Sequence, residues 1–583
     1  MSYLPIEDHG VIGNLHTAAL VGVDGTIDWL CLPAFDSPSV FCSILDDDKG
    51  GHFVLRPAEH GRSQQLYLPD SNVLLTRFLS REGMAEVIDF MPILSGPGDR
   101  PRLVRNVRVV RGTMSIEVDC RPAFDYARGE HHVSVGGDGA VFTAKDARHS
   151  SLGLSTDVRL ERETRGGVGA RFTLKGGERA TFVLAEVDEG KRPAPRLSHG
   201  EFEELLGSTL DYWRRWISRS TYHGRWREFV HRSALVLKLM AYDPTGAFVA
   251  APTMGLPERV GGGRNWDYRY AWLRDAAFTL YALISIGFEE EAERFMDWLR
   301  DRCASDADGL LQPLYGIDGR SRMDEEELGH LSGYMDSRPV RLGNAANDQV
   351  QLDLYGAILD AAYLYNKHGA PLDYDLWQNL RRILDWLGEH WREPDEGIWE
   401  VRGGRRQFVS SKVMSWVALE RAVRVARQRG LPAHELRWIR ERDAIYEEVM
   451  EKGWNPEKNS FVQYYGADAL DASLLLMPLV KFVGPTDPRW ISTLDRIREE
   501  LTYDTLVDRY ETANAAPDGL EGDEGSFSLC SFWLVECLTQ AGRLDEARLS
   551  LEKMFSYANH LGLYAEEIGS SGEALGNFPQ ALT

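Results

Sequence analysis

The chain has 583 residues, which is more than one ordinary domain holds, so we expect at least two domains. Its formal net charge is −23, from 66 Lys and Arg against 89 Asp and Glu, and this surface would repel the phosphate backbone of a nucleic acid. Hydrophobic residues make up 43%, and no apolar run reaches the roughly 18 residues that a membrane span needs. A globular protein with no nucleic-acid partner and no membrane segment is therefore expected.

The cysteines and the first residues indicate a reducing compartment. The 6 cysteines form no CxxC pair and have no regular spacing, so we expect free, buried thiols. The opening residues, Met1 to Asp8, contain neither the basic nor the apolar region of a signal peptide. The sequence therefore predicts a cytoplasmic protein. It does not indicate an oligomeric state.

Residues 1–200 have the pattern of short strands separated by turns. In residues 103–110, side chains alternate with a period of two, which is typical of a sheet with one partly solvated face. Roughly ten such strands fit, enough for two packed antiparallel sheets. Glycine-containing turn signals separate the runs: Asp24-Gly25, residues 137–139 and residues 166–167. We expect a β-sandwich here.

After a stiff Arg-Pro-Ala-Pro-Arg break at residues 192–196, the apolar period becomes helical. About a dozen helices in antiparallel pairs would form a double ring, with the long loops building a cleft at one end. We expect a helical linker over residues 201–222 and a helical barrel over residues 223–583. The clearest helices are predicted over residues 270–286, 347–368, 373–391, 525–540 and 544–555.

A lone carboxylate, Glu400, stands between Trp399 and Val401 in a loop before a helix that Ser410 and Ser411 are expected to cap. Desolvation in such a setting disfavours the charged form of an acid, and a carboxylic acid that stays protonated can donate a proton to a leaving group. The alternative is an ordinary loop glutamate.

Arg274 and Asp275 are expected at the start of a helix whose later residues are apolar. An Arg beside an Asp can hold vicinal hydroxyls from both sides, because one donates and the other accepts hydrogen bonds. The alternative is a buried salt bridge. Further along the chain, Arg509 precedes an acid-rich loop and Glu566 follows a helix; the alternatives there are a surface arginine and a solvated acidic pair.

Metal and nucleophile patterns are weak. The pair His131-His132 has no spaced third ligand, and the acidic runs at residues 46–48 and 324–327 lack the ligand spacing of a calcium loop. There is no GxSxG motif and no P-loop, and the glycines of residues 261–263 do not lead a strand into a helix. We therefore expect no metal and no cofactor.

Taken in order, these motifs resemble glycoside hydrolase family fifteen, the glucoamylases and the bacterial and archaeal trehalases, over essentially the whole chain. Residues 11–21 and 25–33 are similar to the N-terminal domain of the trehalase-like branch, as are residues 337–346. Tyr268 to Asp275 resembles the family motif Tyr-x-x-x-Trp-x-Arg-Asp. The resemblance implies a β-sandwich followed by an (α/α)6 barrel, and an inverting exo-acting hydrolase that releases β-glucose from an α-glucoside.

Carried over position by position, the resemblance implies a general acid, a general base and a sugar pocket. Glu400 matches the acid and Glu566 matches the base. The residues that match the glucose-binding pocket and the surroundings of the scissile bond are Tyr268, Trp272, Arg274, Asp275, Trp399 and Arg509.

The chain departs from many fungal glucoamylases at two positions. Where those enzymes have a second Glu after the acid, which helps to hold the aglycone sugar, this chain has Val401; where they have a Trp two residues before Arg338-Pro339, it has Asp336. Both changes argue against maltose-type binding and fit the second glucose of trehalose. The alternatives are a glucoamylase or isomaltose-type glucosidase, an inverting disaccharide phosphorylase, and an inactive carbohydrate-binding protein. The chain ends where the family's last barrel helix starts, so we expect a truncated chain.

Overall fold

The computed structural model describes residues 3–583 except residues 60, 95, 97, 147–149, 189, 191, 306–308 and 511–517. The chain forms two compact units, each described separately below. The β unit comprises Met1–Pro244, Leu328–Val340 and Asn559–Leu563. The helical unit comprises Thr245–Glu327, Arg341–Ala558 and Tyr564–Thr583. The domain boundaries expected at residues 200 and 222 stay a prediction.

The strands of the β unit pair antiparallel throughout, and the described residues contain fifteen of them, more than the sequence suggested. They are β1 (His9–Gly13), β2 (Ala18–Gly22), β3 (Thr26–Cys31), β4 (Ser39–Phe41), β5 (His52–Pro57), β6 (Arg62–Tyr67), β7 (Leu74–Leu79), β8 (Gly83–Phe90), β9 (Arg102–Arg121), β10 (His131–Gly136), β11 (Gly139–Ala144), β12 (Ser151–Thr156), β13 (Glu161–Arg162), β14 (Val168–Lys175) and β15 (Arg179–Val187).

The long strand β9 joins the two layers of the β unit. Its first half pairs with β8 and β15, and its second half pairs with β5 and β14. The change of partners falls at Gly112, whose φ is 79°; a Cβ there would lie 1.9 Å from the carbonyl oxygen of Glu82, so a side chain does not fit. The alternation seen in residues 103–110 therefore belongs to a strand of 20 residues shared by both layers.

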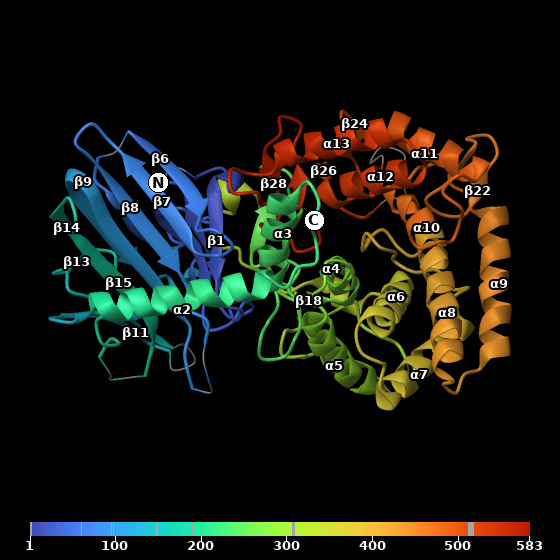
Figure 1. The fold of residues 1–583 in the computed structure, drawn as a ribbon, viewed down its shortest axis with the longest axis horizontal. Helices are drawn as coiled ribbons and strands as arrows, with labels where there is room; N and C mark the ends of the chain where they lie inside the picture. The colour runs from blue at the N-terminus through green and yellow to red at the C-terminus, as the bar shows by residue number, and fades with distance from the viewer. Residues whose placement is uncertain are drawn as a thin grey trace. The chain divides into compact units, whose positions relative to one another are not determined.

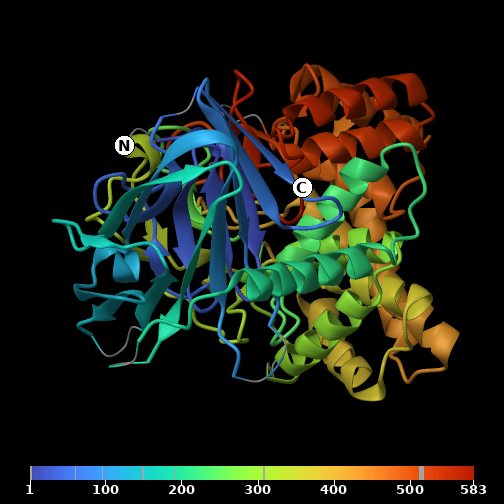
Figure 2. The same ribbon diagram turned by 60° about the vertical axis from the view of Figure 1, so that its left-hand side comes forward.

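The described residues of the β unit also contain three α-helices: α1 (Phe124–Ala127), α2 (His199–Ile217) and α3 (Arg227–Leu239). Helix α2 begins with a capping box in which the Ser198 side chain accepts from the Glu201 amide and the Glu201 carboxylate accepts from the Ser198 amide. Its residues Phe202 and Leu206 pack on the strands through Phe90 and neighbouring apolar side chains, so α2 covers one face of the β unit (Figures 1 and 2). This burial fixes α2 on the sheet.

The helical unit is built from α4 to α13. The helices are α4 (Leu273–Ser285), α5 (Glu290–Ser305), α6 (Asp353–His368), α7 (Tyr374–His390), α8 (Val409–Arg429), α9 (Glu435–Lys452), α10 (Leu476–Leu479), α11 (Pro488–Glu500), α12 (Ser528–Gln540) and α13 (Leu544–Tyr557). Short strands in its loops are β16 (Met254–Pro257), β17 (Asn265–Asp267), β18 (Ala271–Trp272), β19 (Leu314–Tyr315), β20 (Glu326–Glu327), β21 (Arg341–Leu342), β22 (Trp454–Asn455), β23 (Ser460–Phe461), β24 (Thr502–Tyr503), β25 (Leu506–Val507), β26 (Ser526–Phe527), β27 (Glu567–Ile568) and β28 (Ala574–Leu575).

Alternate helices form two layers. Helix α4 packs on α6 and α6 on α8, while α5 packs on α7 and α7 on α9. Consecutive helices such as α8 and α9, and α12 and α13, lie side by side (Figure 1). The five helices predicted most clearly are all present, with ends shifted by a few residues. The prediction that Ser410 and Ser411 cap α8 is wrong, because α8 begins at Val409 after Phe408 and both serines lie in its first turn.

All six cysteines, which lie among the described residues, are buried thiols outside any disulfide, as expected. Among the described residues, no helix combines the length and the apolar character needed to cross a membrane.

Candidate active site

A pocket in the helical unit brings together most of the residues predicted from the sequence. Seven of the eight line it: Tyr268, Trp272, Arg274, Asp275, Trp399, Glu400 and Arg509. The eighth, Glu566, does not line the pocket, but its carboxylate is hydrogen-bonded to Tyr268, which does. The pocket is lined from loops and helix starts, as the distribution of polar residues in the sequence suggested.

Tyr268 and Trp272 form the centre of the site. Trp272 is the last residue of the short strand β18 and Tyr268 lies just before that strand, and their rings pack edge to face with centroids 5.3 Å apart. Tyr268 Oη donates to Glu566 Oε1 at 2.6 Å, and Trp272 Nε1 donates to Glu400 Oε1 at 2.9 Å. This aromatic pair therefore holds two carboxylates that are 166 positions apart in the sequence, from 400 to 566.

Glu400 has a left-handed backbone, with φ of 57°, in a turn closed by the bond from its amide to the Gly397 carbonyl. Such a conformation is uncommon for a residue with a side chain and is often found at functional sites. Its Oε1 accepts from both Trp272 Nε1 and, at 3.2 Å, Arg274 Nη2. Within the described part of the chain, no hydrogen bond reaches Oε2, so that oxygen is free to interact with a ligand.

Arg274 and Asp275 lie in the first turn of α4, where apolar residues of the same helix anchor them. Arg274 Nε donates to Asp275 Oδ1 at 3.2 Å, and Arg274 Nη1 donates to Gln351 Oε1 at 3.1 Å. Asp353, at the start of α6, lies 3.6 Å from Arg274 and is also buried. Burial raises the pKa of Asp275 to about 6, although the charge of Arg274 opposes that rise. The predicted pair is thus a fixed, largely desolvated donor and acceptor.

Glu566 precedes β27 and is only 1% exposed. Its Oε1 accepts from Tyr268, and its Oε2 accepts from the Asn577 amide at 3.3 Å. Burial, reinforced by the nearby charge of Glu258, raises the pKa of Glu566 to about 8. The carboxyl group is thus held by two donors in a setting that disfavours its charge.

Trp399 and Arg509 form another wall of the pocket. Trp399 Nε1 donates to both oxygens of Asp471 at 2.9 and 3.0 Å, which fixes the plane of the indole. The Arg509 guanidinium lies 5.6 Å from the Trp399 ring centroid and 5.3 Å from that of Phe527. Arg509 is therefore a buried residue of the pocket, and the surface-arginine alternative is wrong.

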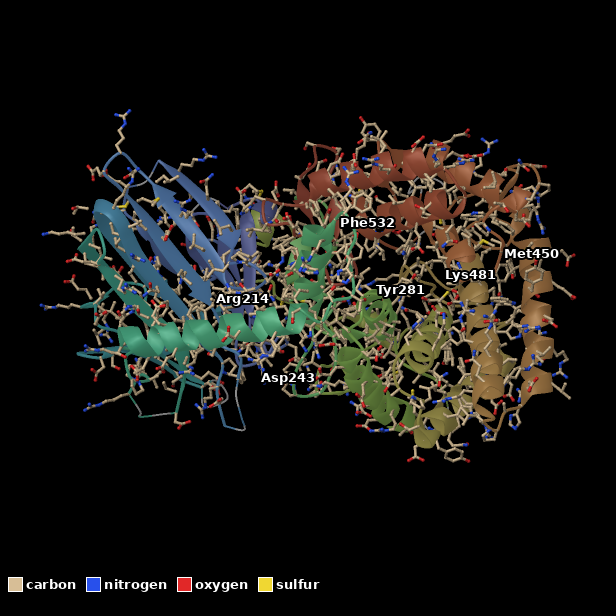
Figure 3. The ribbon with its side chains drawn as sticks, in the orientation of Figure 1. Arg214, Asp243, Tyr281, Met450, Lys481 and Phe532 are labelled. Atoms are coloured by element: carbon tan, nitrogen blue, oxygen red, sulfur yellow. The ribbon has the colours of Figure 1, made fainter. Side chains whose placement is uncertain are left out.

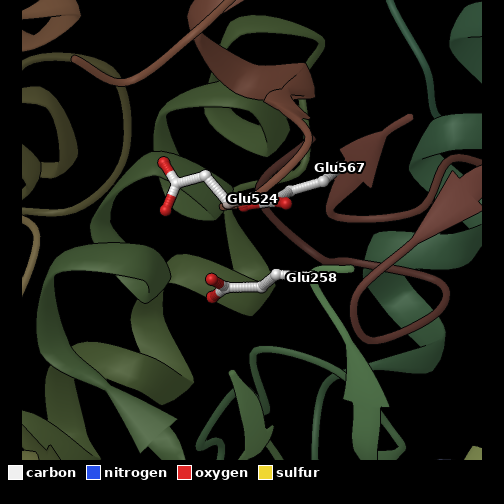
Figure 4. A group of neighbouring side chains, drawn as sticks. All are labelled: Glu258, Glu524 and Glu567. Carbon is white, nitrogen blue, oxygen red and sulfur yellow. The ribbon is translucent and has the colours of Figure 1, made fainter. Parts of the chain in front are cut away.

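Three carboxylates beside Arg509 come together from separate loops: Glu258, Glu524 and Glu567 (Figure 4). Their nearest oxygens lie within 4.8 Å of one another, close enough to share a cation. Guanidinium groups already lie among them, because Arg509 Nε donates to Glu524 at 2.8 Å and Arg264 Nη1 donates to Glu524 at 3.1 Å. The cluster is best described as an ionic network that holds Arg509.

Glu258 and Arg402 also line the pocket but were not predicted. Glu258 follows β16 and accepts from Trp266 Nε1 at 2.8 Å. It lies in one of the long loops that were expected to build a cleft, and this was the only signal for it. Arg402 is two residues after Glu400, and this closeness to the expected acid is the one feature of the sequence that could have pointed to it.

A second cavity in the helical unit, of about 230 Å3, has a different character. It is lined mainly by apolar side chains of the helices, among them Tyr281 of α4 and Phe532 of α12 (Figure 3). Two acids, Asp360 and Glu536, are its only charged lining residues among those described. Without an Arg–Asp pair it lacks the donors and acceptors for holding a sugar, so the first pocket is the candidate active site.

Comparisons with known proteins agree with this geometry. The family model "Glycosyl hydrolases family 15" matches residues 224–583, and the model "Trehalase-like, N-terminal" matches residues 2–162. The chain is 40% identical to the trehalase of Mycobacterium tuberculosis, over 99% of this chain and 88% of that protein. It is 41% identical to the trehalase of Thermoplasma acidophilum, over 97% of this chain and 96% of that protein.

A solved bacterial glucoamylase in complex with acarbose has the same fold, with a TM-score of 0.73 at 14% identity, covering 100% of this chain and 93% of that one. The fold and the matches define a glycoside hydrolase with an antiparallel β-sandwich followed by an (α/α)6 barrel. The chain belongs to glycosyl hydrolases family 15. The family, fold class and enzyme class expected from the sequence are confirmed.

Proposed function

We propose that the chain is an inverting, exo-acting α-glucosidase that hydrolyses α,α-trehalose to two molecules of glucose. Glu400 acts as general acid and Glu566 as general base. The observation that carries this proposal is the packed pair of rings, Trp272 and Tyr268, which donate hydrogen bonds to Glu400 and Glu566 respectively at one pocket. The trehalase relatives, which match nearly the full chain, support the choice of substrate.

The first glucose binds against the fixed pair Arg274–Asp275. Arg274 donates to sugar hydroxyls and Asp275 accepts from them, in a setting from which burial excludes water. The indoles of Trp272 and Trp399 offer flat apolar faces to the ring. Since Arg274 also reaches Glu400, the same side chain fixes the sugar relative to the acid.

The acid step uses the unoccupied oxygen of Glu400. Oε1 already accepts two hydrogen bonds, so we place the proton on Oε2. As the bond between the anomeric carbon and the glycosidic oxygen breaks, this proton passes to that oxygen, and the leaving glucose departs neutral. Glu400 is left as a carboxylate beside Arg274, which stabilises the new charge.

The base step uses Glu566. Its carboxylate removes a proton from water while the water oxygen bonds to the anomeric carbon on the face opposite the leaving group. Inversion requires the two carboxyl groups to be roughly 6.5–9.5 Å apart, so that the water fits between. The Tyr268 hydroxyl at 2.6 Å stabilises the ionised form against the burial that raises the pKa of Glu566 to about 8.

Substitution of each acid tests these roles. Glu400→Gln and Glu566→Gln should each lower kcat on trehalose by roughly 10²- to 10⁴-fold, the usual size of general acid–base catalysis. Glu573→Gln is the matched control, because Glu573 hydrogen-bonds to Ser571 away from the pocket and should not affect turnover. Near-normal turnover by either pocket variant would refute the assignment. A requirement for phosphate would favour the phosphorylase alternative.

A further inference from the structure

The backbone after Glu400 sends alternate side chains in different directions. The left-handed conformation of Glu400 turns the chain so that Glu400 and Arg402 both line the pocket. Val401 between them is 3% exposed and does not line the pocket. The position next to the acid, where a second glutamate was considered from the sequence, therefore does not face a ligand here, and Arg402 does.

Arg402 is held rigidly at the pocket. Its Nη2 and Nη1 donate to the two oxygens of Glu325 at 2.7 and 3.1 Å, and its guanidinium lies 4.6 Å from the centroid of the Trp266 ring. Its amide donates to the Asp518 carbonyl at 2.5 Å. Gly519, with φ of 78°, allows this approach, because a Cβ there would lie 2.5 Å from the carbonyl carbon of Arg402.

These contacts leave a preorganised hydrogen-bond donor. Glu325 pairs with Arg402 and also lies 3.5 Å from the Arg341 guanidinium, and the hydrogen bond from Arg402 lowers the pKa of Glu325 against the opposing effect of burial. The Arg402 side chain remains 28% exposed, enough to contact a ligand in the pocket it lines. The guanidinium keeps N–H groups that Glu325 does not use, and these can donate to the hydroxyls of a sugar.

We propose that Arg402 determines specificity by donating hydrogen bonds to hydroxyls of the leaving sugar; this rests on the proposed α-glucosidase function. Arg274 and Asp275 lie in a helix turn and hold the first glucose, whereas Arg402 comes from the loop of the acid, beside loop residues such as Trp266. The acid protonates the glycosidic oxygen, so the loop that carries it lies next to the leaving sugar. A glutamate beside the leaving sugar would accept hydrogen bonds from its hydroxyls. Arg402 donates hydrogen bonds instead and so selects a different set of hydroxyls.

The test compares a disaccharide with a substrate that has no leaving sugar. α-Glucosyl fluoride reacts with water to give glucose and HF, and its leaving group has no hydroxyl for Arg402 to bind. In Arg402→Met, which keeps an unbranched apolar stem, kcat/KM on trehalose should fall roughly 10- to 100-fold. On α-glucosyl fluoride, fluoride release should stay within about threefold of the unsubstituted chain, since no bond to a leaving sugar is lost.

Arg405→Met is the matched control, because Arg405 lies in the same loop, pairs with Glu396 at 2.9 Å and does not line the pocket. It should leave both substrates unaffected. Equal losses on both substrates in Arg402→Met would mean that Arg402 only maintains the fold, and no loss on trehalose would mean that it does not contact the leaving sugar; either result overturns the proposal. An unsubstituted chain inactive on both substrates would refute the proposed function itself, and this inference with it.

Discussion

The burial of the Glu566 carboxyl group leads us to predict that the free energy of unfolding depends on pH, and this can be measured without any turnover assay. Glu566 is 1% exposed, and its pKa is raised from 4.5 to about 8, first by burial and then by the charge of Glu258. A glutamate with a raised folded-state pKa contributes stability that is fully present below pH 4.5 and is lost as the pH rises through about 8. Replacing it by Gln, which is neutral at every pH, should remove this loss.

The size of this change in stability follows from the shift in the pKa of Glu566. At about 1.4 kcal/mol per pKa unit, the stability that protonated Glu566 contributes falls by on the order of 3 kcal/mol between pH 5 and pH 8. The free energy of unfolding of Glu566→Gln relative to the unsubstituted chain should therefore rise by roughly this amount between pH 5 and pH 8. Asp275 and Asp395, whose pKa values do not depend on Glu566, titrate in both proteins and cancel in the difference.

The assay is urea unfolding followed by tryptophan fluorescence at pH 5 and pH 8 for both proteins. Glu573→Gln serves as control, because Glu573 is partly exposed and its pKa is lowered, chiefly by the Ser571 side chain, against burial. That variant should follow the unsubstituted chain between these two pH values. If the difference in the free energy of unfolding between Glu566→Gln and the unsubstituted chain is the same at pH 5 and pH 8, the pKa of Glu566 is not raised and the reasoning is wrong.

Three further predictions concern single contacts of the pocket. Tyr268→Phe removes the donor 2.6 Å from Glu566, so the pKa of the base should rise further and the acidic limb of the kcat/KM profile should move to higher pH; an unmoved limb would contradict this role. Asp275→Asn should raise KM for trehalose and lower kcat/KM by roughly 100-fold, measured by steady-state kinetics, and an unchanged KM would exclude Asp275 from sugar binding. Arg509→Gln removes one of the two guanidinium groups, with Arg264, that pair with Glu258 and Glu524, and it should lower the free energy of unfolding by about 3 kcal/mol; a fully stable variant would show that the network does not depend on Arg509.

Much of the fold could be predicted from local pattern. The two-residue period of residues 103–110 and the helical periods after Glu201 each report how a segment buries one face, and the structure confirms both. The full length of β9 could not be predicted, because the Gly112 that lets the strand change partners reads as a turn. The prediction of the α8 cap was wrong because a serine caps a helix only if the helix begins after it, whereas α8 begins at Val409, before both Ser410 and Ser411.

The site was predictable where residues stand in recognisable order, as with Arg274 and Asp275 at a helix start. Glu258 and Arg402 carried no such signal, since their role depends on which loops meet in space. Glu258 reaches the site because Trp266 and Arg509 hold it there, and Arg402 does so because the backbone turns at Glu400. Neither arrangement follows from a period or a motif.

The central claim, hydrolysis of trehalose with inversion, is tested most directly by proton NMR of the products formed in the first minutes. Trehalose, maltose and isomaltose are supplied in separate tubes without phosphate. We predict that trehalose is consumed fastest and yields one β-glucose and one α-glucose at first, because water attacks only one anomeric carbon and inverts it. Two α-glucose molecules at first would contradict inversion, and faster consumption of maltose or isomaltose would contradict the assignment of trehalose.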